Sequence, residues 1–231
     1  MHASVLFWIS RSFAANEPEI AQDALPAHEL QREMRKLRRR WQKNINDSAP
    51  ELAKWFATSV EKRSTAALKK TLRDGGFSVK FTMTRAQSDI LNATVNANVS
   101  LIKSIPQKYL NQVEGAVMRS VQQGGDLSKL TKGIRKEYGV TQRRAELIAR
   151  DQNNKATSAM NKARRIELGL IEAIWLHSHA GKKPRPTHVA MNGKKFDIRK
   201  GMYDSHEKRY VQPMELINCR CKSKPVVPGF S

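Results

Sequence analysis

The chain has 231 residues, 39% of them hydrophobic, which suits one large domain or two small ones with a modest core. Its formal net charge is +21. A protein this basic repels itself and needs a polyanion or an acidic protein surface as counter-charge, so nucleic acid is the first partner to consider. The alternative hypothesis is that the positive charge only keeps the protein soluble and binds no specific class of partner. Only 6% of the residues are aromatic, which disfavours base stacking on single strands and favours contacts to the duplex backbone.

The two cysteines, Cys219 and Cys221, do not make the framework of a secreted disulfide protein, and reduced thiols in a cytosol are expected. A disulfide between them would close a strained, very small ring. The apolar patch within residues 1–15 is short and has no positive charge before it, so a signal peptide is not favoured. No later run approaches the roughly 20 apolar residues of a membrane helix, so no membrane partner is expected.

Residues 1–27 are expected to be a flexible lead-in, because their second half is acidic and interrupted by proline. Apolar residues then recur at three- and four-residue steps through residues 28–168, which predicts a helical region. The predicted apolar stripes include Met34, Trp55, Val113 and Ile134. Brief connections between the stripes favour antiparallel neighbours. The stretch 77–83 alternates in polarity and predicts a short strand or an extended linker. The predicted helix starts are Ser48, Thr84, Pro106 and Thr141, three of them capping residues and one a proline of a first turn.

The first predicted helix, whose apolar stripe runs from Leu30 to Ile45, carries a dense set of basic residues on its other faces. The set is either a solvated face or a face that tracks phosphates, and the sequence leaves both open. A second basic group lies in the C-terminal segment. The nucleic-acid-binding candidates are Arg35, Arg38, Arg39, Arg40, Lys43, Lys182, Lys183, Arg185 and Arg220.

The last predicted helix, from Thr141 to about Leu168, has an inward stripe of small residues that would let another helix approach closely. The polar turn from Arg150 to Asn154 interrupts it and is expected to be exposed surface or an internal hydrogen-bonded lock between helices. A catalytic role for Asp151 is not expected, because no second carboxylate lies at helical spacing to pair with it. The stripe consists of Ala145, Ala149, Ala156, Ala159 and Ala163, flanked by Ile148, Met160, Ile166 and Leu170.

Residues 169–231 abandon helical periodicity and form a small His- and Cys-containing segment. A strand is predicted over 171–179, a hairpin turn at Met191–Lys194 and a polar loop over 199–209. The predicted fold class is therefore α+β and mainly α: an antiparallel helical region followed by a small segment with short strands and long loops.

This segment concentrates soft metal ligands. A structural zinc ion has four ligands, which are histidine nitrogens or cysteine sulfurs. The Cys-x-Cys pair together with two histidines would supply such a set. The spacing is tighter than the usual Cys-x-x-Cys, so the alternative stays open that the thiols are small buried apolar groups and the histidines ordinary polar side chains. A structural zinc is the cofactor considered, with candidate ligands His177, His179, His188, Cys219 and Cys221, and with His206 as a further histidine of the segment.

A catalytic function of this segment is the alternative hypothesis to a structural metal site. A histidine could activate water in a metal-dependent nuclease while an arginine held phosphate. However, the acidic residues of the region, Asp197, Asp204, Glu207 and Glu215, form no compact motif of the kind that magnesium requires. No catalytic residue and no small-molecule substrate is therefore expected.

The segment also resembles a known family. Its Trp-ended strand, the Arg-x-x-His element from Arg185 to His188, the Asn-Gly turn into Lys-Lys-Phe, Pro213 and the closing Cys-Arg-Cys-Lys resemble the C-terminal signature of the Mu-F-like phage head morphogenesis proteins. The upstream stretches NVSLIKSIPQKYLNQVEGAV and GIRKEYGVTQRRAELIARDQNNKATSAMNKAR resemble the helical run of that family. The resemblance covers roughly residues 90–225. The chain departs from the family pattern at Asp151-Gln152 and at Gly181-Lys182-Lys183.

The resemblance implies a minor head protein of a tailed phage. It implies attachment to the portal protein, with coat or scaffold protein and non-specifically bound double-stranded DNA as further partners, during head assembly, packaging or ejection. It also implies a location inside the head near the portal vertex, and in the host cytoplasm during assembly. The alternative function is a metal-dependent nuclease or a toxin-like effector.

Overall fold

The structure is a computed structural model and describes residues 1–15, 25–74, 76, 78, 80–122, 127–179 and 183–227. Four helices come first: α1 (His2–Ala15), α2 (Leu25–Asp74), α3 (Arg85–Gln122) and α4 (Leu127–Glu167). The C-terminal segment holds the short helix α5 (Pro186–Ala190) and the strands β1 (Glu172–Leu176), β2 (Lys195–Asp197), β3 (Met202–Asp204), β4 (Arg209–Val211) and β5 (Lys222–Pro225). The long helices run antiparallel, and short antiparallel strands follow, which confirms the predicted fold class.

The helices are fewer and longer than the capping patterns predict. Ser48 does not begin a helix; it lies inside α2 and donates its hydroxyl to the Asn44 carbonyl. Pro50 is also inside α2 and deprives the helix of one backbone donor. Ala49 and Ala53 on either side are fully buried, and their burial favours an uninterrupted helix at this point.

Pro106 likewise lies inside α3, and Thr141 lies inside α4, where its hydroxyl donates to the Glu137 carbonyl. Thr84 is the predicted start that the structure confirms, since its Oγ1 accepts the Gln87 N–H at 3.4 Å just before α3. Single residues with capping potential are therefore weak signals when helix-forming sequence continues on both sides.

The lead-in expected over residues 1–27 is helical as far as Ala15, and residues 16–24 lie outside the described part. The reason is amphipathic packing, because Val5 and Ile9, four residues apart, are both buried. The linker after α2 forms no strand at the described residues 78 and 80–84.

Contacts divide the chain into two compact units, which share the three long helices. Unit 1 comprises residues 1–52 and 99–146, and unit 2 comprises residues 53–98 and 147–231. The predicted boundaries at residues 28 and 168 therefore do not coincide with the compact units. Unit 1 has an apolar core of Val5, Ile9, Met34, Leu37, Tyr109, Leu110, Val113, Val117, Leu130 and Ile134.

The helical part of unit 2 buries a different face of α2 from the one that its largest side chains predict. Trp55 is 67% exposed, whereas Ala53 and Ala57 are buried. Leu68 and Leu72, near the end of α2, form a small cluster with Leu170. Small residues thus allow close packing at the start of this part of α2, and leucines fill the space at its end.

The end of α4 also departs from the predicted alanine stripe. Ala156 and Met160 are buried as expected, but Ile166 is 39% exposed. Arg164 and Arg165 are buried in its place. Arg164 donates to Ser64 Oγ at 2.6 Å and to Glu61 Oε1 at 2.8 Å, both on α2, so a buried ion pair replaces apolar packing here.

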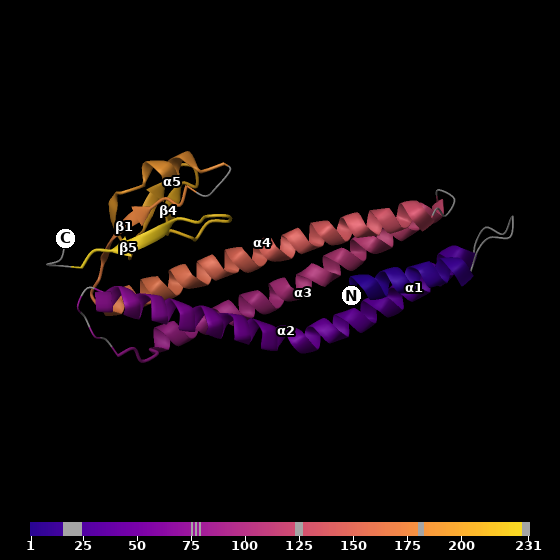
Figure 1. The fold of residues 1–231 in the computed structure, drawn as a ribbon, viewed down its shortest axis with the longest axis horizontal. Helices are drawn as coiled ribbons and strands as arrows, with labels where there is room; N and C mark the ends of the chain where they lie inside the picture. The colour runs from indigo at the N-terminus through magenta and orange to yellow at the C-terminus, as the bar shows by residue number, and fades with distance from the viewer. Residues whose placement is uncertain are drawn as a thin grey trace. The chain divides into compact units, whose positions relative to one another are not determined.

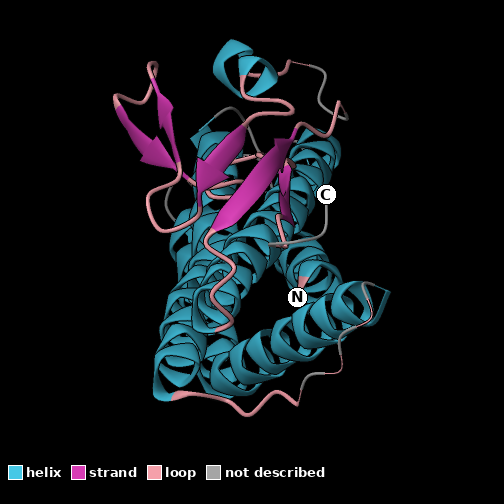
Figure 2. Ribbon diagram, turned by 90° about the vertical axis from the view of Figure 1, so that its left-hand side faces the viewer, coloured by secondary structure: helices cyan, strands magenta, loops and turns pink. Residues whose placement is uncertain are grey.

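The C-terminal segment of unit 2 folds into two small antiparallel sheets, drawn as magenta arrows in Figure 2. The first has the order β2-β1-β5, with Trp175 opposite Ser223. The second is the β3–β4 hairpin, in which Tyr203 faces Tyr210. Figure 1 shows β1 and β5 beside the later part of α4, which belongs to the same unit. The segment's core contains Ala173, Trp175, Met191, Phe196, Ile198, Val211, Leu216, Cys219 and Cys221.

Two local predictions for this segment need correction. The Met191–Lys194 turn does not join two hairpin strands, because it follows α5 and leads into β2. Strand β2 pairs with β1, and α5 lies between these two strands in the sequence. The stretch 199–209 is not simply a loop, because it holds β3 and the start of β4. Gly201 makes this arrangement possible: its φ is +92°, and a Cβ there would lie 2.5 Å from the Val211 carbonyl oxygen.

No helix among the described residues is long and apolar enough to cross a membrane.

Candidate metal centre

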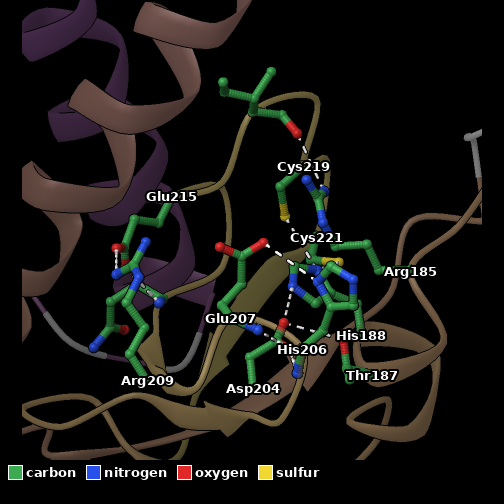
Figure 3. Close-up of polar contacts among 12 residues, drawn as sticks. Arg185, Thr187, His188, Asp204, His206, Glu207, Arg209, Glu215, Cys219 and Cys221 are labelled. Atoms are coloured by element: carbon green, nitrogen blue, oxygen red, sulfur yellow. Dashed lines mark hydrogen bonds and ion pairs between the residues drawn. The ribbon is translucent and has the colours of Figure 1, made fainter.

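His188, Cys219 and Cys221 meet in the core of the C-terminal segment (Figure 3). His188 Nδ1 lies 3.5 Å from Cys219 Sγ and 3.6 Å from Cys221 Sγ. The three candidate ligand atoms all lie within 4.8 Å of one another, and all three residues are buried. One nitrogen and two sulfurs at this separation form a donor set that suits zinc.

The other ring nitrogen of His188 faces a carboxylate. Nε2 lies 3.3 Å from Asp204 Oδ2, close enough for an ion pair but without hydrogen-bond alignment. Asp204 is fully buried and accepts the hydroxyl of Thr187 and the backbone N–H of His206. Metal-binding histidines commonly turn their second nitrogen to such a carboxylate, which fixes the ring's orientation.

The two thiols differ in acidity. A hydrogen bond from Cys221 lowers the pKa of Cys219; burial opposes this shift, while His188 and the backbone N–H groups of Cys221 and Met214 reinforce it. The same thiol–thiol hydrogen bond raises the pKa of Cys221, and burial adds to that rise. These opposite shifts make Cys219 the more acidic of the two thiols and favour its thiolate form. A thiolate is the form of cysteine that binds a metal.

The loop from Met214 to Asn218, which we call the cysteine loop, has an uncommon backbone conformation. Met214 and Asn218 both have left-handed backbone angles, with φ of 70° and 61°. The Met214 N–H points to Cys219 Sγ at 3.3 Å, and Arg185 Nη1 donates to the Ile217 carbonyl at 3.1 Å. The Arg-x-x-His element thus contacts the cysteine loop with its arginine and the thiols with its histidine.

A polar seam on α4 fixes the segment to the helix. Asp151 accepts the Asn218 N–H at 3.2 Å, and Asn154 Nδ2 donates to the Cys219 carbonyl at 3.0 Å. Ser158 donates to the Pro213 carbonyl at 2.6 Å. The polar turn therefore forms hydrogen bonds between α4 and the C-terminal segment, and not between two helices as predicted. We define the polar seam as Asp151, Asn154, Ser158, Lys162 and Arg165, whose spacing of three and four places them on one helix face.

The structure brings together only part of the predicted ligand set. His177 is half-buried and lines the same cavity of about 680 Å³ as His188 and the two cysteines. Burial first, and then the charges of His179 and His188, lower the pKa of His177. His179 and His206 are exposed. Among the described residues, the group close enough to share an ion is His188, Cys219 and Cys221.

The predicted nucleic-acid-binding residues fall into two groups, one in each unit. In unit 1, Arg35, Arg39, Arg40 and Lys43 are exposed on α2, and Arg38 pairs with Glu114. In unit 2, Lys183, Arg185 and Arg220 line the cavity at the candidate metal centre, and Lys182 lies outside the described residues.

The acidic residues considered for a magnesium site do not converge on one point. Asp197 pairs with Arg199, and Glu215 pairs with Arg209. Asp204 is engaged with His188 and Thr187. Glu207 Oε1 lies 3.9 Å from His206 Nδ1, so each of the four carboxylates has its own partner within the segment.

Sequence comparison identifies the stretch that carries this centre. Residues 111–224 match the family described as Phage Mu protein F like protein. Over this stretch the chain is similar to the Mu-F-like family. The match confirms the resemblance found in the sequence. The Mu-F-like stretch contains the polar seam and all three residues of the metal centre.

One curated relative also matches the chain. It is an uncharacterized protein of Haemophilus influenzae, 33% identical over 137 residues, which are 59% of this chain. The matched part spans 29% of the length of that relative. No solved structure matches the chain.

Proposed function

We propose that this protein is a minor head protein of a tailed phage that acts in head morphogenesis at the portal vertex. The Mu-F-like match over residues 111–224 is the observation that carries the proposal. The family supports a structural protein of the phage head. The C-terminal segment is the surface that we assign to docking, because its own core and the polar seam hold it as a fixed shape.

Untagged protein mixed with portal and coat proteins of the phage that encodes it tests this proposal. We expect portal oligomers to co-purify with the chain equally well before and after nuclease treatment, since the contact is between proteins. Loss of all portal and coat protein after nuclease would leave only a DNA-bridged association and contradict portal docking. Magnesium-dependent cleavage of plasmid DNA by the pure chain would favour the alternative nuclease function.

The second part of the proposal is sequence-independent binding to packaged DNA. The net charge of +21 and the exposed Arg35, Arg39, Arg40 and Lys43 on α2 support it. Each phosphate contact contributes a slope of about 0.9 to the plot of log affinity against log salt concentration. We expect a total slope of several units, the same for unrelated duplexes. An affinity indifferent to salt, or a strong preference for one sequence, would contradict it.

The third part is a structural zinc ion held by His188, Cys219 and Cys221. The donor set fits zinc, the Cys219 thiolate is favoured, and Asp204 provides the carboxylate that orients the histidine. His177 borders the same cavity and is the histidine that we assign to the fourth position. A bound zinc would tie α5 to the cysteine loop and so stiffen the docking segment.

A further inference from the structure

A second cavity in unit 2 lies away from the metal centre. Its volume is about 390 Å³, within the range of about 300–1,000 Å³ typical of small-ligand pockets. It lies between the later part of α2, the later part of α4, and the C-terminal residues 198, 212–214 and 222–223. We call it the basic pocket.

The charge of the basic pocket is one-sided. Arg63, Lys162, Arg165 and Lys222 line it, and none of the residues that line it is acidic. Uncharged hydrogen-bonding groups complete the wall: Ser64, Asn153, Thr157, Ser158, Asn161, Gln212 and Ser223. Cations together with neutral donors, without carboxylates, are the groups that bind an oxyanion.

Arg165 is the residue of the basic pocket that most favours an anionic ligand. It is only 8% exposed, its Nη1 donates to Ser223 Oγ at 2.6 Å and its Nη2 donates to the Ser223 carbonyl at 3.0 Å. Its Nε is buried without a hydrogen-bond partner among the described residues. Burial lowers the pKa of Arg165 to about 10, so the guanidinium still carries its charge at neutral pH.

The neighbouring arginine shows what is missing. Arg164 is also buried, and its Nε likewise has no hydrogen-bond partner among the residues described, but its guanidinium pairs with Glu61 and donates to Ser64. Arg165 has no carboxylate partner within the described part of the chain. A buried charge without a counter-charge is costly, and an anionic ligand in the pocket removes that cost.

The wall that holds Arg165 is itself fixed. Ser158 donates to the Pro213 carbonyl at 2.6 Å, and Lys162 Nζ donates to the Arg199 carbonyl at 2.9 Å. Gln212 Nε2 donates to the Ile198 carbonyl at 2.8 Å. These bonds hold α4 and residues 212–214 in place around the pocket. Binding of a ligand therefore needs little additional ordering of the protein.

We propose that the basic pocket binds a phosphate group, with Arg165 at its base and Arg63 and Lys222 at its exposed rim. The group comes either from a free phosphate or phosphate ester or from a DNA backbone, since both present the same oxyanion. The proposal stands independently of head assembly and of zinc, because no residue of the metal centre lines this pocket.

Calorimetric titration of the full-length protein with inorganic phosphate at constant ionic strength tests it. The double variant Arg63→Gln/Lys222→Gln removes two exposed rim charges, and Lys194→Gln/Lys200→Gln removes two exposed charges that do not line the pocket. We expect the rim variant to bind phosphate about tenfold more weakly and the control to bind like the wild type. Unchanged melting temperatures of both variants without phosphate would show that the fold is intact.

Three results would overturn the proposal: no binding of millimolar phosphate to the wild type, equal weakening in the two double variants, or acetate binding as tightly as phosphate. Duplex DNA distinguishes the two sources. Greater loss of duplex affinity in the rim variant than in the control, with competition by free phosphate, supports the DNA backbone. Equal duplex affinity in the two variants, with phosphate binding lost only in the rim variant, supports a free phosphate or phosphate ester.

Discussion

The two compact units bury different kinds of side chain. The core cluster of unit 1 is aliphatic apart from Tyr109, and Thr141 is the polar residue that the unit buries among those described. Unit 2 buries two arginines, two aspartates and a histidine in addition to its apolar clusters. Hydrophobic contacts are non-directional, whereas buried charges need specific partners. Unit 1 therefore depends on apolar area, and unit 2 depends on particular pairs.

The largest effect expected in unit 2 comes from removal of the proposed zinc ion. Protein purified without chelator should contain close to one zinc per chain, and chelation should unfold the C-terminal segment, because in small metal sites binding free energy is folding free energy. Hydrogen exchange should then rise in peptides from residues 172–225 and stay low around Val113 in unit 1.

His188→Ala should reproduce the effect of the chelator, and His206→Ala is the matched control, because His206 is an exposed histidine of the same segment. A metal content near zero, together with a melting temperature indifferent to chelator, would leave the thiols as buried packing groups. In that case their replacement by serine should cost only a few kcal/mol.

The next effect concerns the buried ion pair. Glu61→Ala removes the carboxylate that lies 2.8 Å from Arg164 and leaves a charge that is 1% exposed without its partner. We expect a loss of about 3 kcal/mol in the free energy of unfolding, measured by urea denaturation. Glu33→Ala breaks the exposed pair with Lys36 in unit 1 and should cost less than about 1 kcal/mol. Equal losses in the two variants would remove the distinction between the units.

Unit 1 should respond to lost apolar volume instead. Val113 is fully buried in its core, and Val113→Ala should cost about 2 kcal/mol through lost transfer energy and a small cavity. The loss should appear in urea denaturation without any change in zinc content. A Val113→Thr variant that is as stable as the wild type would contradict an apolar environment, since the buried hydroxyl needs a partner.

The smallest expected effect comes from one bond of the polar seam. Asn154→Ala removes the donor to the Cys219 carbonyl and should cost about 1 kcal/mol. Hydrogen exchange should increase around Cys219 more than elsewhere. Asn153→Ala, one residue earlier on the same helix, is the control, and an equal effect there would show that the seam bond is not special.

Some features of the helices could be predicted from the sequence, and others could not. Helical periodicity correctly predicts the buried faces around Met34, Val113 and Ile134, because burial of aliphatic side chains in a helix follows a simple repeat. The predicted helix starts at Ser48 and Pro106 are wrong, because continuous packing outweighs the local capping and proline signals at these residues. Helical periodicity fails at Trp55, which is exposed although it is the largest apolar side chain nearby.

The candidate site was predictable in part. Clustering of histidine and cysteine identifies His188, Cys219 and Cys221, but it does not distinguish them from His179 and His206, since only the path of the loops decides which histidine reaches the thiols. The polar seam carried a signal, the spacing of three and four among the polar residues from Asp151 to Arg165. The missing carboxylate partner of Arg165 has no counterpart in the sequence pattern.

The most direct test of the account is incorporation of the Cys219→Ser/Cys221→Ser variant into phage heads. The account assigns docking to a segment held in shape by these thiols, and DNA binding to basic residues outside the centre. The variant should therefore keep its affinity for duplex DNA but be absent from purified heads that contain the wild-type chain. Normal incorporation of the variant, with the segment shown by hydrogen exchange to be unfolded, would contradict the docking role of the segment.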